Sequence, residues 1–100
     1  MFDDEQKQFY NTIIDECFRN ISYSNIEYYI VTDDVYMITF TVHCNYTIVV
    51  KYNSGNSMFT IKIHNCETNE YILNINYLID NTITKMFELI KNIIQFDYFV

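Results

Sequence analysis

Apolar and polar side chains alternate along the middle of the chain, between positions 35 and 65. Ile38, Phe40 and Val42 fall on one parity, whereas Thr39 and Thr41 fall on the other. Alternation with a period of two is typical of β-strands that bury one face and leave the other in water. We therefore predict strands through this region, with the threonine-rich parity forming the solvated face of a sheet.

Short polar segments divide this part of the chain into about five predicted strands. The turn segments are Asp33-Asp34, Asn45, NSGNS at 53–57 and CETNE at 66–70. The strands expected around them are Ile26–Thr32, Val35–Cys44, Tyr46–Tyr52, Met58–His64 and Tyr71–Ile75. Because parallel strands need a crossover of a dozen or more residues, connections this short predict an antiparallel meander.

The two ends of the chain show the longer period of amphipathic helices. The first predicted helix covers residues 3–20, and its acidic first turn suits the positive end of the helix dipole. Its apolar stripe comprises Phe9, Ile13, Ile14, Cys17, Phe18 and Ile21. The stripe of the last helix comprises Ile83, Met86, Phe87, Ile90, Ile93 and Ile94. Candidate N-caps for that helix are Asp80, Asn81 and Thr82.

The element order αβββββα predicts an α+β fold, a two-layer sandwich in which both helices pack on one face of the meander. Residues 1–100 are expected to form a single domain. The helix-covered face should carry Ile38, Phe40, Val42, Ile48, Val50, Tyr52, Phe59, Ile61, Ile63, Tyr71, Leu73 and Ile75. The open face should carry Met37, Thr39, Thr41, His43, Thr47, Val49, Lys51, Met58, Thr60, Lys62, His64, Ile72 and Asn74.

The open face has a second interpretation, as a docking platform for another protein. Several apolar side chains are expected among its threonines, and apolar patches of this kind often mark interfaces. These side chains are Tyr29, Val31, Met37, Val49, Met58 and Ile72.

Composition and charge narrow the classes of partner. Half of the residues are apolar and 18% are aromatic, which excludes a disordered tail. The net charge is −7, with only six Lys and Arg residues, so phosphate backbones would be repelled and direct binding of nucleic acid is not expected. An acidic balance favours solubility and attraction to a basic surface of a protein partner.

Several features indicate a cytoplasmic protein. No apolar run approaches the length of a membrane span, and the N-terminal segment MFDDEQKQF does not resemble a signal peptide. Cys17, Cys44 and Cys66 are an odd number without a C-x-x-C pair, which fits reduced thiols. The absence of Ala and Pro and the abundance of Ile, Asn and Tyr indicate A/T-rich coding, as in phages, large viruses, firmicutes, mollicutes and parasites. A viral origin would place the protein in the host cytoplasm.

The chain contains few residues in patterns typical of metal binding or catalysis. His43, His64 and Cys66 are expected at the same end of the sheet and are zinc-ligand types, which makes them a weak candidate for a metal site. Their spacing fits no standard zinc pattern, so neither a metal nor another cofactor is expected. The sequence contains no glycine-rich phosphate loop and no G-x-S-x-G motif. We expect no enzymatic activity.

The sequence thus indicates a small acidic protein-binding module. By analogy of size and charge with phage antagonists of host defence, including anti-CRISPR proteins, it predicts an inhibitor that occludes the surface of a host nucleic-acid-handling or defence protein. The alternatives are an immunity protein that neutralises a toxin and a structural homo-oligomer, such as a homodimer. The residues predicted to bind the partner are Asp33, Asp34, Glu67, Glu70, Tyr28, Tyr29, Met37, Met58, Tyr98 and Phe99.

Overall fold

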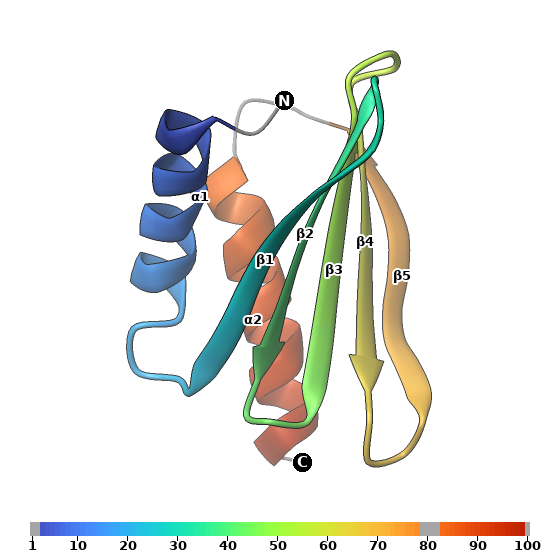
Figure 1. Cartoon of the computed structure of the whole chain (residues 1–100). Helices are drawn as coiled ribbons and strands as arrows, with labels where there is room; N and C mark the ends of the chain where they lie inside the picture. Colours follow the sequence, from blue (N-terminus) through green and yellow to red (C-terminus); the bar gives the residue numbers. More distant parts are fainter. Residues whose placement is uncertain (1–2, 79–82, 100) are drawn as a thin grey trace.

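The computed structural model describes residues 3–78 and 83–99, and within these ranges it contains two helices and five strands (Figure 1). The elements are α1 (Asp4–Cys17), β1 (Tyr23–Thr32), β2 (Val35–Val42), β3 (Tyr46–Asn53), β4 (Met58–Asn65), β5 (Glu70–Leu78) and α2 (Ile83–Phe99). The predicted order αβββββα and the α+β class are confirmed. The candidate caps Asp80, Asn81 and Thr82 lie outside the described residues.

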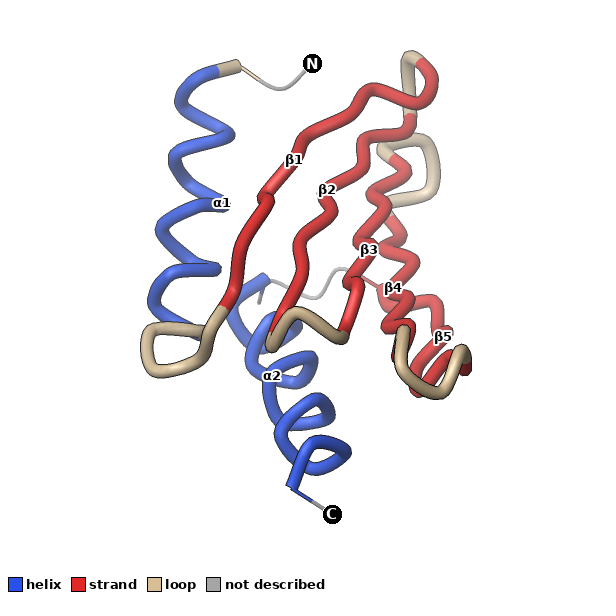
Figure 2. Tube along the Cα trace, turned by 60° about the horizontal axis from the view of Figure 1, so that its bottom comes forward, coloured by secondary structure: helices blue, strands red, loops and turns tan. Residues whose placement is uncertain are grey.

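Each strand of the sheet pairs with its neighbour in the sequence, and every pairing is antiparallel. The described strands therefore form the predicted meander, in the order β1-β2-β3-β4-β5. Both helices lie on the same side of this sheet, and the other side carries no helix of the described chain (Figures 1 and 2). The result is the expected two-layer sandwich with one open face.

Helix α1 begins at a reciprocal cap. The Gln6 amide N–H donates to Asp3 Oδ1 at 2.8 Å, and the Asp3 amide N–H donates to Gln6 Oε1 at 3.3 Å. This capping box satisfies two N–H groups that a helix start otherwise leaves without acceptors. The apolar stripe of α1 differs from the prediction at one position. Phe9 is 52% exposed, and Tyr10 packs against the core instead.

The hydrophobic core lies between the helices and the central strands. Phe40 in β2 stands at its centre, with ring centroids 5.4 Å from Phe18 and 6.3 Å from Phe87. The predicted parity is confirmed through β2, β3 and β4, where the buried positions alternate along each strand. The buried apolar side chains of these strands are Ile38, Phe40, Val42, Tyr46, Ile48, Val50, Phe59, Ile61 and Ile63.

Strand β5 interrupts the period of two with an irregularity beside β4. Ile63 pairs with Leu73, but the next residue, His64, pairs with Tyr71, so Ile72 is skipped. One extra residue on a strand reverses the parity of the side chains before it. Tyr71 is consequently 61% exposed and touches His64, whereas Ile72 packs against the core. The predicted faces of Tyr71 and Ile72 were therefore wrong, and those of Leu73 and Ile75 were correct.

None of the helices among the described residues is long and apolar enough to cross a membrane. Cys17, Cys44 and Cys66 are all free thiols, with Cys17 buried and the other two exposed.

Candidate functional site

The largest hollow described lies at one end of the sheet, which we call the lower end because it is at the bottom of Figure 1. The β2–β3 turn, the β4–β5 turn and the last turn of α2 meet there. The hollow has a volume of about 550 Å³, which is within the range of ligand-binding clefts. We call it the acidic hollow, and it is lined by His43, Asn45, Tyr46, Asn65, Glu67, Thr68, Glu70, Ile72, Asp97 and Tyr98.

Asp97 is the polar centre of the acidic hollow. It projects from the end of α2, and its Oδ2 accepts a hydrogen bond from the Tyr46 hydroxyl at 2.7 Å and one from Asn65 Nδ2 at 3.2 Å. Tyr46 and Asn65 are both buried, so their donors need an acceptor from the protein. Asp97 thereby ties the last helix to the first residue of β3 and the last residue of β4.

Asn65 also organises the β4–β5 turn. Its Oδ1 accepts the amide N–H of Glu67 at 2.9 Å, that of Thr68 at 3.2 Å, and Asn45 Nδ2 at 3.1 Å. Side-chain to backbone bonds of this kind, made to residues two and three positions ahead, stabilise tight turns. Asn45 Nδ2 lies 3.4 Å from Glu67 Oε2 as well, which joins the two turns of the lower end to each other.

The electrostatic character of the hollow is negative. Its lining includes the carboxylates of Glu67, Glu70 and Asp97 and no Lys or Arg among the described residues. Burial, the hydrogen bond to Asp97 and the negative charges of Asp97 and Glu67 together raise the pKa of Tyr46 to about 12. The Tyr46 phenol therefore stays protonated and keeps donating to Asp97 at physiological pH.

His43 lies on the helix side of the sheet, which contradicts its predicted place on the open face. The chain turns through His43 and Cys44 with φ values of 54° and 57°, so the alternation of β2 stops before His43. The His43 ring stacks on Tyr98 of α2, with centroids 4.0 Å apart and an angle of 10° between the planes. Its Nε2 is buried and has no hydrogen-bond partner among the described residues.

The last turn of α2, which carries Asp97 into the acidic hollow, also carries three exposed aromatic side chains. Phe96 and Phe99 are each 75% exposed, and Tyr98, which lines the hollow, is 49% exposed. The rings of Tyr98 and Phe99 meet edge to face at 5.0 Å. We call Phe96, Tyr98 and Phe99 the aromatic rim. Large apolar side chains left in water beside a polar hollow are a feature of protein interfaces.

The four carboxylates predicted to bind a partner are divided between two ends of the sheet. Glu67 and Glu70 line the acidic hollow. Asp33 and Asp34 lie in the β1–β2 turn at the upper end, where Ser54 of the β3–β4 turn donates its amide N–H to the Asp34 carbonyl at 2.8 Å. A partner in contact with one pair is therefore turned away from the other pair (Figure 1).

The remaining predicted contacts are dispersed. Tyr28 packs against the core, and its hydroxyl donates to the Lys7 carbonyl at 3.1 Å and also contacts Asn11, so it joins β1 to α1. Tyr29 is exposed and pairs with Met37 across the open face. Met37 also pairs with Lys51, and Met58 pairs with Asn53 and Leu78, so polar and apolar neighbours are mixed on that face.

The candidate metal ligands do not converge. His64 and Cys66 lie close together, with 3.7 Å between Nδ1 and Sγ, but His43 stacks on α2 across the sheet. Within residues 3–78 and 83–99, no group of three or more His, Cys, Asp or Glu side chains could hold a metal ion. Of the three candidate ligands, only His64 and Cys66 therefore lie close to each other.

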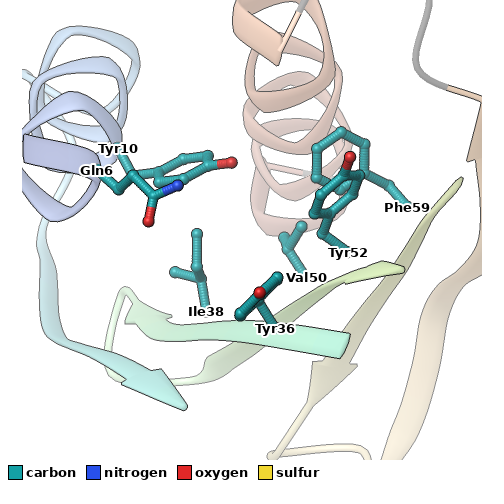
Figure 3. A pocket seen from close by; sticks show the side chains of 7 residues that line it. All are labelled: Gln6, Tyr10, Tyr36, Ile38, Val50, Tyr52 and Phe59. Carbon is teal, nitrogen blue, oxygen red and sulfur yellow. The ribbon is translucent and has the colours of Figure 1, made fainter. Parts of the chain in front are cut away.

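A second cavity lies under the N-terminal half of α1, and Figure 3 shows the side chains around it. The rings of Tyr36 and Tyr52 stack there at 6.5 Å, and burial followed by the proximity of Tyr52 raises the pKa of Tyr10. The cavity measures about 60 Å³, which suits a few water molecules and is too small for a substrate. Its lining consists of Gln6, Tyr10, Tyr36, Ile38, Val50, Tyr52 and Phe59.

Sequence reasoning missed the residues that shape the acidic hollow. Asp97, Asn65 and Tyr46 were not among the predicted site residues, although Asp97 is the one acidic residue in the apolar segment FDYFV. A carboxylate among aromatic residues at the end of an amphipathic helix needs donors if it is buried, and that signal could have identified it.

Comparisons with known proteins returned no match, neither to a protein-family model nor among curated proteins or solved structures.

Proposed function

We propose that the protein is a protein-binding inhibitor that covers a basic surface of its partner with its lower end. The observation that supports this is the gathering of Glu67, Glu70 and Asp97 beside the exposed aromatic rim. Carboxylates give attraction and register toward Lys and Arg, while buried aromatic side chains supply most of the binding free energy of an interface. Tyr98 links the two kinds of group, because its ring lines the hollow and also contacts Phe99.

In this mechanism a Lys or Arg side chain of the partner enters the acidic hollow. Glu67 lies in the β4–β5 turn and Glu70 is the first residue of β5; both are exposed and can accept charge-assisted hydrogen bonds from it. The Tyr98 ring, already stacked on His43, offers a face to the cation. The rim residues Phe96 and Phe99 then lose their contact with water as the partner covers them.

The class of partner follows from charge. Proteins that handle nucleic acids bind phosphates with Lys and Arg side chains. The chain has a net charge of −7, so its surface carboxylates can compete with the phosphates for those Lys and Arg side chains. This favours a viral or phage antagonist of a host nucleic-acid-handling or defence protein, similar in action to an anti-CRISPR protein. An immunity protein bound to a basic toxin would use the same contacts, and a toxin gene beside this gene would distinguish it.

The test uses two double variants with the same change in net charge. Glu67→Gln with Glu70→Gln removes two charges at the hollow, and Asp33→Asn with Asp34→Asn removes two at the opposite end. Proteins captured from host-cell lysates by the wild type are quantified by mass spectrometry against both variants. We expect the specific partner to be bound at least about tenfold more weakly by the Glu variant only, with an association rate that falls as salt rises.

Two outcomes would contradict the proposal. Equal losses in both variants would mean that net charge alone drives the association, and full retention by the Glu variant would remove the hollow from the interface. Self-association through the aromatic rim is tested separately by sedimentation of the wild type at high protein concentration. A dimer that dissociates on the change Phe96→Ser with Phe99→Ser would favour the homo-oligomer instead.

A further inference from the structure

The open side of the lower end carries a cluster of three side chains, Thr47, His64 and Asn69, around the exposed thiol of Cys66. Cys66 Sγ lies 3.7 Å from His64 Nδ1 and 3.4 Å from Thr47 Oγ1. On the far side of the imidazole ring, His64 Nε2 lies 3.1 Å from Asn69 Oδ1. The order thiol, imidazole, amide is an arrangement in which a base and its orienting group stand next to a nucleophile.

The fold explains why these groups meet. His64 projects from β4 to the open face, and Cys66, the first residue after β4, contacts His64 and Thr47 there. Asn65 between them is buried toward α2. Thr47 is the cross-strand partner of His64. Asn69 has a φ of 59°, a conformation that Asn adopts more readily than most residues, and this turns the chain back so that its amide reaches the ring.

The surrounding contacts hold the cluster in place. The Cys66 amide N–H donates to the Asn45 carbonyl at 2.8 Å, which fixes the backbone next to the thiol. The Tyr71 ring, brought to the open face by the irregularity in β5, packs against His64 with 4.9 Å between centroids. The imidazole is thus confined between an aromatic ring, an amide and the thiol.

The hydrogen bonds indicate which nitrogen of His64 carries the proton. An amide oxygen only accepts, so the contact with Asn69 Oδ1 places the ring proton on Nε2. Nδ1 is then an unprotonated acceptor that faces the Cys66 thiol. The Thr47 hydroxyl is also placed to donate to the sulfur once the thiol has lost its proton.

We infer that Cys66 is a reactive thiol that exchanges with low-molecular-weight disulfides, with His64 as its base and Asn69 as the residue that positions the base. His64 Nδ1 takes the proton of the thiol, and the thiolate attacks one sulfur of the disulfide. The bond between the two sulfurs of the reagent breaks as the bond to Cys66 forms. The leaving thiolate takes the proton from His64, so that Cys66 ends as a mixed disulfide and one reagent thiol is released.

A disulfide suits this site better than an acyl donor. Attack on sulfur needs only a thiolate and room for three sulfurs in line, and Cys66 is exposed. Acyl transfer requires donors preorganised around an oxyanion, whereas Thr47, His64 and Asn69 contact the thiol and the imidazole instead.

The chain supplies two internal controls. Cys44 is also exposed, in the neighbouring β2–β3 turn, and no hydrogen bond to its thiol is found among the described residues. Cys17 is buried, and burial followed by the charge of Glu88 raises the pKa of its thiol, which disfavours the reactive thiolate. The three cysteines should therefore react in the order Cys66, Cys44, Cys17.

The experiment treats the full chain with 4,4′-dithiodipyridine, a neutral disulfide whose released thione is followed by absorbance. Variants Cys44→Ser and Cys66→Ser report each exposed thiol alone, and mass spectrometry locates the adduct. At pH 7 we expect Cys66 to react on the order of tenfold faster than Cys44.

Two further variants test the roles of the neighbours. His64→Gln should lower the rate of Cys66 at pH 7 to about that of Cys44 and leave the rate of Cys44 unchanged. Asn69→Gly keeps a backbone that tolerates positive φ but removes the amide, and should lower the rate of Cys66 by a smaller factor. Equal rates of Cys66 and Cys44 in the wild-type background across pH would overturn the inference, as would a His64→Gln protein that reacts as fast as wild type.

Discussion

At the scale of single residues, the turns place ordinary L-residues where the backbone favours glycine. His43, Cys44 and Ser57 have φ values between 54° and 57°, and Asn69 has a φ of 59°. His and Asn are enriched in that region, whereas Cys and Ser are not. The single glycine, Gly55, does not have a positive φ. A left-handed conformation costs an L-residue roughly 1–2 kcal/mol. Part of this strain, at His43 and Cys44, lies beside the acidic hollow.

Replacing Ser57 with Gly should stabilise the protein. The substitution removes a strain of roughly 1–2 kcal/mol and adds about 0.5–1 kcal/mol of chain entropy to the unfolded state. We expect the free energy of unfolding to rise by up to about 1 kcal/mol, which urea denaturation followed by circular dichroism would measure. Gly55→Ala is the control. Its new Cβ would lie 3.2 Å from Asn53 Oδ1, a side-chain atom, so a change within about 0.5 kcal/mol is expected. A destabilised Ser57→Gly protein would show that the strain argument is wrong.

At the scale of elements, the irregularity between β4 and β5 decides which side chains of β5 face the core. It sends Tyr71 to the open face, where it covers His64, and it turns Ile72 toward the core. The irregularity at this one residue therefore has two effects. It places Ile72 in the lining of the acidic hollow, and it places the Tyr71 ring against His64 in the thiol cluster.

This assignment reverses the stability effects that simple alternation predicts. Ile72→Thr removes a partly buried apolar side chain from the core and should lower the free energy of unfolding by about 1–2 kcal/mol. Tyr71→Thr changes an exposed position and should cost less than about 0.5 kcal/mol. Both values come from urea denaturation under the same conditions. If Tyr71→Thr were the more destabilising change, Tyr71 would lie in the core and the register shift between β4 and β5 would be wrong.

Much of this element-level description could be predicted from the sequence, because burial on one face imposes a period that is visible in the residues. The alternation of Ile38, Phe40 and Val42 located β2 and its covered face. Local period carries no information on a skipped residue or on a turn that reverses a side chain, so Ile72 and His43 were misplaced. The bond from Tyr46 to Asp97 joins positions 51 residues apart, and no pattern within either segment indicates it.

At the scale of the whole molecule, phenols hydrogen-bonded to carboxylates couple stability to alkaline pH. The hydrogen bond to Asp15, followed by burial, raises the pKa of Tyr23 to about 12, and burial followed by the bond to Asp97 does the same for Tyr46. A folded-state pKa above the unfolded value of about 10 means that the folded protein holds its phenolic protons more tightly. The corresponding stability is fully present below about pH 10 and is lost as the pH rises toward 12.

The wild type should therefore become less stable between about pH 10 and pH 12, and Tyr46→Phe should lose less stability over that interval. At pH 7 the variant should be less stable than the wild type by roughly 1–3 kcal/mol, because Asp97 loses a donor. Urea midpoints measured at intervals of pH give both effects. Adding Tyr23→Phe should flatten the alkaline decline further. A Tyr46→Phe protein with an unchanged decline would contradict the assignment of the shift to this phenol.

The pairing of each strand with its sequence neighbour has a kinetic consequence. Every pair of strands can close locally, so little chain entropy is lost before the first backbone hydrogen bonds form. The slow contacts are those between α2 and the early strands, such as Phe87 against Phe40. Folding should thus proceed as a rapid zippering of hairpins, and the late docking of α2 should complete the acidic hollow last, since Asp97 and Tyr98 arrive with that helix.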